Sequence, residues 1–429
     1  MAPETLSVVD LDDDTAGPLR DPPFNPFRTP RTDRARALVA DVLGQLGVYE
    51  EYRGLRQRKR QRSAQINYEC AVAAVVCDVL RRHLTLPGEW VAQPLSNRYV
   101  RKSRYRSPIL GNQFSALLDR MTVAEMDFIE VRKGCINPFL PWNTATTIRA
   151  SKRLITRAEE FDIGIDDFGL DPSEETIVLK HPKAIGAKLR DDRQEYEDTD
   201  TTRRYRTEVV RINSWLENAD IDCGSAEEVG VDVYDRRLRR IFNERFDRGG
   251  RLFGGFWMNM KKHYREGLSL DGDSIAVPDY SQMIATTLYA QAGHPRPEQD
   301  AYKIPGYEFH REGMKKLFAA MVHSSHELKR FPEDLPETLT RQGSFAKVSA
   351  AVLEAHAPIR DFFYCGAGMG AMFHESEVLV DVLLRLIDRE ITALPIHDAV
   401  IVPKRHLKTT IATMKDVFKE RFGVYPVVT

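Results

Sequence analysis

The 429-residue chain has no apolar run close to the roughly 20 residues that a membrane-spanning helix needs, so we expect no membrane span. It has only five cysteines and no Cys-x-x-Cys pair, which argues against a disulfide scaffold and a cysteine-based zinc site. The acidic first residues show neither the basic segment nor the apolar core of a secretory signal. These absences predict a cytoplasmic protein.

An excess of charge of one sign is also missing, because 62 Lys and Arg residues balance 63 Asp and Glu residues. Nucleic-acid binding depends on local potential rather than on this sum. Basic residues gather at 53–62, 98–106, 203–206 and 236–251, in part beside tyrosines, as in grooves that bind phosphates and stack bases. Solvated helix faces give the same pattern about as often. The residues that we single out for nucleic-acid contact here are Arg98, Arg101, Lys102, Arg104, Arg203 and Arg204.

The composition divides the chain into three parts. Residues 1–36 are first acidic and then proline-rich, and we expect them to form a disordered tail. Residues 37–229 carry apolar residues three and four positions apart, which predicts a mainly helical region. From residue 230 to residue 429 short β-like runs alternate with helical patterns, and this part is predicted to have an α+β fold.

Two aspartates lie where predicted elements change direction. Asp279 follows a predicted strand over 274–278 and precedes a predicted helix over 281–293, and Asp398 lies at the tip of a predicted hairpin over 391–403. Two carboxylates on rigid elements can bind a pair of divalent ions that activate a 3′-hydroxyl and neutralise a triphosphate. Mg²⁺ suits this task, with Mn²⁺ as an alternative ion. Taken singly, Asp279 is better explained as a helix N-cap and Asp398 as an ordinary turn residue.

A predicted basic helix over 310–330 lies between these aspartates in the sequence. Arg311 and Lys315 are four residues apart and therefore share one face, and His323 follows two turns later. Two cations on one face can bind the phosphates of a nucleotide, and a ring can pack on its base or sugar. A solvated basic helix is the commoner explanation of an isolated pair of this kind.

The order of these elements resembles motifs A, B and C of the family A polymerases and the related single-subunit phage-type RNA polymerases. The matching segments are DYSQ at 279–282, Arg311-x-x-x-Lys315 followed by the ring of His323, and the His-Asp pair at 397–398. GGRLFGGF at 249–256 is similar to the Gly-Arg segment that approaches template and primer in these enzymes. The resemblance covers about residues 235–429. It implies a right-hand palm, whose antiparallel sheet carries the His-Asp hairpin, and helical fingers, preceded by a mainly helical, partly thumb-like region.

The resemblance also implies roles for individual residues. Asp279 and Asp398 would bind the two metal ions with help from the Tyr280 carbonyl, and Arg311 and Lys315 would contact the triphosphate. The other positions that would border the nucleotide or the nucleic acid are His323, where the family usually has tyrosine, Gln282, Ile284, Arg251, and His397 beside the primer terminus.

The sequence departs from the family where the sugar is selected. The DNA polymerases usually carry a glutamate two residues after the glutamine of DYSQ, and this glutamate screens the 2′-position of the sugar. Here that position is Ile284, and the motif B aromatic is replaced by Ala319. The choice between deoxyribose and ribose therefore stays open.

Together, these observations predict a small, monomeric, template-directed nucleotidyltransferase that acts on nucleoside triphosphates with a DNA template and primer. DYSQ favours DNA synthesis, and the missing 2′-screen keeps RNA synthesis or priming as the alternative. A non-catalytic nucleic-acid-binding protein on the same palm is a further alternative, against which the four retained polar positions argue. A third is an unrelated helical regulator with a coincidental motif order. The compact size would suit a mobile element or a phage.

Overall fold

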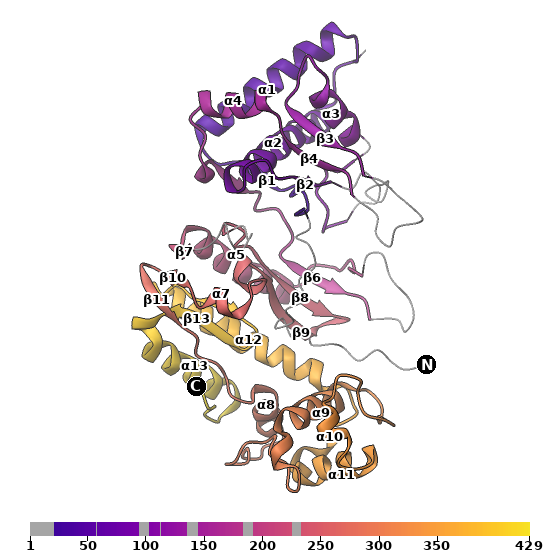
Figure 1. Cartoon of the computed structure of the whole chain (residues 1–429), viewed down its shortest axis with the longest axis vertical. Coiled ribbons are helices and arrows are strands. Elements are labelled where there is room, and N and C mark those ends of the chain that lie inside the picture. The colour runs from indigo at the N-terminus through magenta and orange to yellow at the C-terminus, as the bar shows by residue number, and fades with distance from the viewer. Residues whose placement is uncertain are drawn as a thin grey trace. The chain divides into compact units, whose positions relative to one another are not determined.

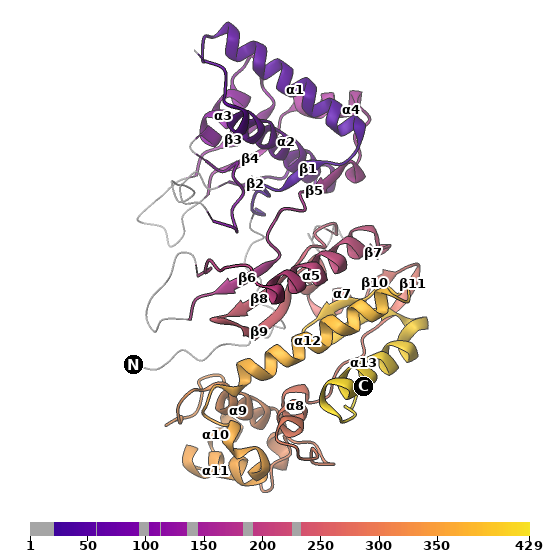
Figure 2. The ribbon, with the colours of Figure 1, turned by 180° about the vertical axis from the view of Figure 1, so that it is seen from behind.

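The computed structural model describes residues 21–56, 58–93, 103–111, 113–134, 145–182, 192–224 and 233–429. These residues form two compact units, an N-terminal unit that ends at Glu175 and a C-terminal unit that begins at Thr176 (Figures 1 and 2). The boundary predicted at 229–230 is therefore wrong. Two strands that precede it belong to the C-terminal sheets: β6 (Ile177–Lys180) pairs with β8 (Leu238–Asn243), and β7 (Ile221–Cys223) pairs with β10 (Leu268–Leu270).

The N-terminal unit is built around two long helices, α1 (Asp33–Tyr52) and α2 (Arg62–Thr85). The middle of α2 is buried at almost every position, which makes it the central helix of this unit. Most of the regular structure of this unit is helical, as predicted, and two small antiparallel sheets complete it. The remaining elements are β1 (Arg28–Pro30) paired with β5 (Phe168–Leu170), the sheet β2 (Val91–Ala92), β4 (Thr147–Ala150) and β3 (Ile129–Arg132), and the helices α3 (Gln113–Thr122) and α4 (Lys152–Glu160).

The prediction that residues 1–36 form a disordered tail is wrong for residues 21–36. Residues 1–20 lie outside the described residues. Phe24 is buried in the core of the N-terminal unit, and β1 pairs with β5. Helix α1 then begins at Asp33, with the Thr32 side chain accepting a hydrogen bond from the Ala35 N–H. These contacts join positions far apart in the sequence, so local composition did not reveal them.

The main sheet of the C-terminal unit is antiparallel and has the strand order β12-β13-β11-β10-β7. Strands β12 (Leu394–Ile396) and β13 (Ala399–Pro403) form the predicted hairpin, and β11 (Asp273–Ala276) confirms the predicted strand. The sheet shares one apolar core with α5 (Asp200–Asn218), α12 (Ala367–Ile387) and α13 (Leu407–Phe422). The α+β class of this part is therefore correct.

A second sheet, β6-β8-β9, is held to α12 by a buried guanidinium. Arg240 on β8 is fully buried and donates to the Gly250 carbonyl at 2.8 Å, the Ser376 hydroxyl at 3.0 Å and the Glu377 carboxylate at 2.5 Å. On β9 (Arg245–Gly254), Gly250 has φ +76°, and a Cβ there would lie 2.8 Å from the Phe242 ring. This close approach explains the glycine pair at 249–250.

The helical part of the C-terminal unit has its own apolar core, which contains residues of α8 (Met283–Gln291), α9 (Arg311–His323) and α11 (Phe345–Ala355). The predicted helix 281–293 thus forms, slightly shortened, and the predicted helix 310–330 ends at His323 because Ser324 leaves helical backbone geometry. In the part of the chain that the structure describes, no helix is both long and apolar enough to cross a bilayer. The shorter elements are η2 (Ile165–Asp167), η3 (Phe256–Met258), α7 (Lys262–Arg265), η4 (Glu308–His310), α10 (Glu337–Thr340), η5 (Ala357–Phe362) and η6 (Lys404–His406).

Replacing the buried Arg240 should destabilise the C-terminal unit. We expect Arg240→Ala to lower the free energy of unfolding by about 3 kcal/mol, because the Glu377 carboxylate then stays buried without its closest partner. The matched control is Arg203→Ala, which breaks an exposed pair with Asp200 and should cost less than about 1 kcal/mol. Urea unfolding monitored by tryptophan fluorescence measures both changes, and equal losses would contradict the prediction.

Candidate active site

Asp279 lies beside the β12–β13 hairpin of the main C-terminal sheet, and Asp398 lies in the turn of that hairpin. Asp279 faces Ala399 in an antiparallel bridge, and the Val400 N–H donates to the Pro278 carbonyl at 3.2 Å. Directly opposed residues in antiparallel strands have Cα atoms about 4.5–5.5 Å apart. Asp398 directly precedes Ala399, so the sheet brings the two predicted metal-binding carboxylates together.

The turns beside both aspartates have unusual backbone geometry. In the hairpin, Ile396 pairs with Ala399, which leaves His397 and Asp398 as a two-residue turn, and His397 adopts φ +55°. Gln282, at the start of α8, also lies in the left-handed region with φ +58°, and its side-chain oxygen accepts a hydrogen bond from a backbone N–H at 2.7 Å. Non-glycine residues pay about 1–3 kcal/mol for such strain, which is found most often at functional sites.

The two carboxylates destabilise each other's charge. The Asp279 Oδ1 atom is buried and has no hydrogen-bond partner among the residues that the structure describes. Burial raises the pKa of Asp279, although Lys315 opposes this rise, and burial together with Asp279 raises the pKa of Asp398 to about 6. Two neighbouring carboxylates whose charges are not neutralised destabilise a fold. The same two groups are good ligands for a hard divalent cation.

The donor set therefore fits Mg²⁺ or Mn²⁺. Within the described ranges, no group of three or more His, Cys, Asp or Glu side chains is arranged around a common metal position. The ligands that the chain itself offers are the carboxylates of Asp279 and Asp398 and a backbone carbonyl beside them. Mg²⁺ commonly accepts such an incomplete set, because water and substrate phosphates supply its remaining ligands.

Residues 427–429 fix the backbone around Asp279. Asp279 and Thr429 exchange two backbone hydrogen bonds, each 3.0 Å long. Because peptide groups alternate between the two sides of a strand, the carbonyl of Tyr280 faces the opposite side, where the hairpin lies. The Tyr280 side chain is buried, and its hydroxyl donates to the Met414 carbonyl at 2.7 Å. The sequence analysis missed this pairing, since residues 424–429 carry no motif.

The two cations expected on α9 differ in their surroundings. Lys315 is exposed and forms no ion pair within the described part of the chain, and its charge acts on both Asp279 and Asp398. The Arg311 guanidinium instead donates to Asp300 at 2.5 Å and bonds to Glu312. Of these two cations, Lys315 is therefore the one whose charge the described residues leave unpaired.

Arg251 is bound to a third buried carboxylate, which the sequence analysis missed. Its Nε donates to Oε1 of Glu375 on α12 at 2.6 Å. Glu375 is 1% exposed, and its Oε2 atom is buried without a hydrogen-bond partner. Burial raises the pKa of Glu375, and Arg251 opposes this rise. Arg251 also opposes the rise in the pKa of Asp398 that burial and Asp279 cause. The available signal was an acid beside the long, largely apolar stretch at 378–384 of the sequence.

The remaining predicted nucleotide contacts pack against the helical part of the site. A Cβ on Gly368 would lie 2.4 Å from Nδ1 of His323, so α12 approaches this ring closely. Burial, assisted by Arg251, lowers the pKa of His323 to about 4, and the ring is therefore neutral at neutral pH. Ile284 is partly buried against the apolar core of the helical part.

The predicted nucleic-acid contacts outside this site are balanced by acids where the structure describes them. Arg104 pairs with Glu175 at 3.4 Å, and Arg203 pairs with Asp200 at 2.7 Å. Arg204 lies 3.4 Å from Glu208 and 3.5 Å from Glu377. Outside the described residues lie Arg98, Arg101 and Lys102.

Comparisons with known proteins place this chain near no established family. No protein-family model and no curated protein matches it. One similar solved structure is the POL domain of Pol1 from M. smegmatis in complex with a DNA primer-template and dNTP, with 9% sequence identity and a TM-score of 0.31. The match covers 94% of this chain and 66% of that one, so this chain spans slightly less than two thirds of that domain. The chemistry of the site therefore rests on its own side chains.

Divalent-cation binding should depend on the ionisation of Asp398. Without metal, the raised pKa of Asp398 makes a contribution to the stability of the folded state. This contribution is fully present below the pKa of Asp398 in the unfolded chain, near 4, and is lost as the pH rises through about 6. Millimolar Mg²⁺ should therefore raise the melting temperature at about pH 8, and the rise should vanish below about pH 6, where protons compete with the ion.

Thermal melts with MgCl2, or with KCl at equal ionic strength, measure this effect across the pH range. Asp398→Asn should abolish the Mg²⁺-dependent rise at every pH. A rise that persists under acidic conditions, or in the variant, would contradict the metal assignment.

Proposed function

We propose that this chain is a template-directed nucleotidyltransferase, which extends a nucleic-acid strand from nucleoside triphosphates with two divalent ions. The observation that carries this proposal is the proximity of Asp279 to Asp398 in the neighbouring hairpin turn, with an Asp279 oxygen that is buried and has no hydrogen-bond partner among the described residues. Folding alone gives no reason to bring two such carboxylates together, because their mutual repulsion and desolvation cost stability.

In this proposal the ions, when bound, supply charge neutralisation and activate the attacking 3′-hydroxyl. The carboxylates of Asp279 and Asp398 and the Tyr280 carbonyl would hold them. Lys315 would bind the triphosphate, whose charge grows in the transition state. Arg311 would help only by exchanging Asp300 for a phosphate, so we assign the phosphate contact to Lys315 first.

The strand being extended would lie beside the hairpin turn. His397 is exposed there and adjoins Asp398, which suits a contact with the primer terminus. The bond from Arg251 to Glu375 uses one of five guanidinium N–H donors. The remaining donors of Arg251 and the side chain of Gln282 are the groups that we propose for contact with the strand and the nucleotide.

DYSQ favours DNA as the product, whereas Ile284 keeps RNA synthesis or priming as the alternative. Packing of Ile284 against the apolar core supports a role in the fold rather than at the sugar. No carboxylate stands at that position to screen a 2′-hydroxyl.

The central test is the loss of one metal ligand. Asp398→Asn should lower nucleotide incorporation on a primer–template by at least about a thousandfold, or roughly 4 kcal/mol of transition-state stabilisation. Binding of the primer–template should change little. Primer extension and fluorescence anisotropy measure the two quantities.

The matched control is Asp416→Asn, which makes the same substitution at an exposed position of α13 and should leave extension intact. Near-normal extension by Asp398→Asn would exclude the proposed active site. Equal loss of DNA binding would indicate damage to the fold rather than to catalysis.

We also expect weak discrimination between the two sugars. If Ile284 serves the core, kcat/KM for dATP should exceed that for ATP by less than about a thousandfold, or roughly 4 kcal/mol. Paired extension assays on one DNA template give this ratio. A larger preference for dATP would require another group that excludes ribose, and His323 would be the first residue to replace.

A further inference from the structure

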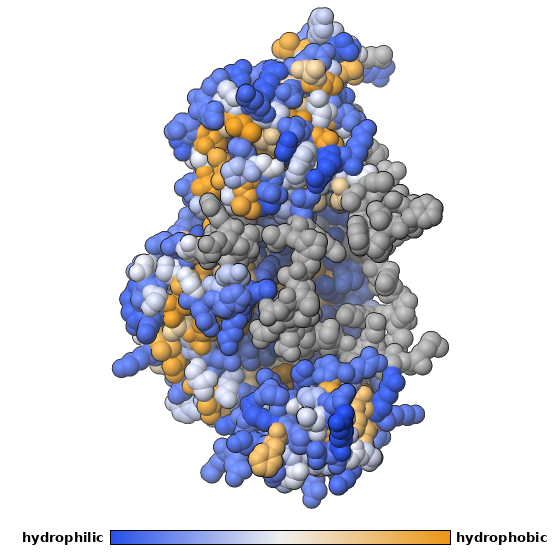
Figure 3. Space-filling view, viewed as in Figure 1, coloured by the Kyte–Doolittle hydropathy of each residue, from blue (hydrophilic) through white to orange (hydrophobic). Residues whose placement is uncertain are grey.

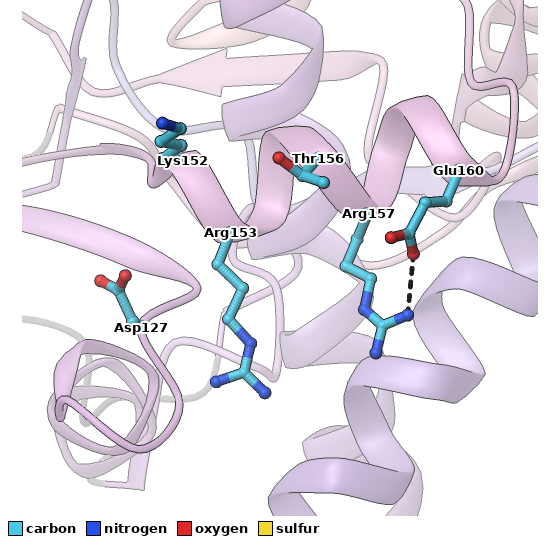
Figure 4. A pocket seen from close by; sticks show the side chains of 6 residues that line it. All are labelled: Asp127, Lys152, Arg153, Thr156, Arg157 and Glu160. Atoms are coloured by element: carbon cyan, nitrogen blue, oxygen red, sulfur yellow. Dashed lines mark hydrogen bonds and ion pairs between the residues drawn. The ribbon is translucent and has the colours of Figure 1, made fainter.

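Most exposed arginines of the described chain are paired with a neighbouring acid. Arg36, Arg203 and Arg341 each pair with an acid three or four residues away on the same helix or at its end. In the pocket of about 370 Å³ beside α4, Arg157 likewise pairs with Glu160 at 2.8 Å (Figure 4). Such residues have little charge left for a partner.

The connection between α1 and α2 is different, and we call residues 53–62 the basic loop. It holds six basic residues and no acid, as the sequence shows. In Figure 1 it lies at the top of the N-terminal unit, where α1 ends. Among the basic patches that the sequence analysis singled out, this one retains unpaired charge.

One buried carboxylate anchors the basic loop. Glu50, near the end of α1, is 1% exposed and lies 2.6 Å from Arg60 and 2.9 Å from Arg120, with Arg56 at 3.7 Å. The Arg60 guanidinium also stacks on the Tyr68 ring at 3.6 Å. A single carboxylate cannot neutralise three guanidinium groups, so the anchor itself keeps an excess of positive charge.

Three further cations of the basic loop have no acidic partner among the described residues. Arg58, Lys59 and Arg62 are exposed, and they form no ion pair or hydrogen bond with any residue that the structure describes. Clustered like charges destabilise a fold, and folding alone would favour an acid among them. The cluster therefore has the charge expected of a surface for a polyanion.

Exposed apolar side chains adjoin the loop. Tyr52 is 83% exposed at the end of α1, and Val48 and Leu55 are exposed beside it. Hydrophobic and hydrophilic residues adjoin each other at the top of the view in Figure 3, where α1 ends. An exposed ring beside unpaired cations is the combination that binds single-stranded nucleic acid, through base stacking and phosphate contacts.

We infer that the basic loop is a nucleic-acid-binding surface, in which Arg58, Lys59 and Arg62 bind backbone phosphates and Tyr52 stacks on a base. The inference adds a strand-binding surface to the proposed function. The role of this surface in strand extension rests on that proposed function. It assigns nucleic-acid contact within the N-terminal unit to this loop rather than to the paired arginines.

The test replaces the three unpaired cations in the full chain, as Arg58→Gln, Lys59→Gln and Arg62→Gln together. Affinity for a single strand of about 20 nucleotides should fall at least tenfold, and the slope of log K against log salt should become shallower by about 2. Tyr52→Ala should weaken binding without changing that slope. Fluorescence anisotropy over a salt series measures both quantities, and circular dichroism checks folding.

The matched control carries Arg36→Gln, Arg211→Gln and Arg341→Gln, which changes the net charge equally but removes arginines that are paired with acids. Its affinity should stay within about threefold of the unmodified chain. Unchanged affinity and slope in the basic-loop variant would overturn the inference. So would unchanged strand binding together with lost binding to phosphatidylserine vesicles, which would assign the loop to a membrane surface.

This result is separable from the proposed function. At saturating primer–template the basic-loop variant should extend the primer at the normal maximal rate, because the loop lies outside the catalytic machinery. Normal extension by Asp398→Asn would exclude the proposed reaction and leave the strand-binding result standing.

Discussion

The backbone pairing of the segment around Asp279 is the constraint on which the candidate active site depends. This segment lies between the hairpin, bridged through Ala399, and residues 427–429, bonded through Thr429. One side of the ladder brings Asp398 beside Asp279, and the other side prevents the strand from shifting. A one-residue slip would reverse every side chain along the strand, so register and chemistry are fixed together.

Helix α12 connects this site to the rest of the C-terminal unit through three consecutive residues. Glu375 binds Arg251, and Ser376 donates to the Gly249 carbonyl. Glu377 accepts hydrogen bonds from Arg240 on β8 and from a residue of α13. Since these partners come from both strands β8 and β9 of one sheet and from a second helix, one turn of α12 sets the position of that sheet relative to α13.

Sequence reasoning succeeded where the signal was local and failed where the partner was distant. The hairpin around Asp398 and the strand before Asp279 follow from short apolar runs and turn residues, and both occur. The pairing of Arg311 with Asp300 could not be read from spacing, because it depends on how the loop before α9 folds back. The domain boundary was misplaced for the same reason, since β6 pairs with β8 across many intervening residues. Glu375 carried a signal, an acid beside a largely apolar stretch, but no motif pointed to its partner.

The unpartnered buried oxygens of Asp279 and Glu375 imply that the metal-free fold is electrostatically frustrated. For each carboxylate, the free-energy cost of desolvation exceeds the stabilisation from its hydrogen bonds. Evolution toward greater stability would therefore replace these residues with amides or apolar residues. Under the proposed function, their presence marks a trade-off in which the chain gives up folding free energy to keep carboxylate ligands for a cation. Directed evolution for thermostability alone should therefore drift toward inactive variants at these same positions.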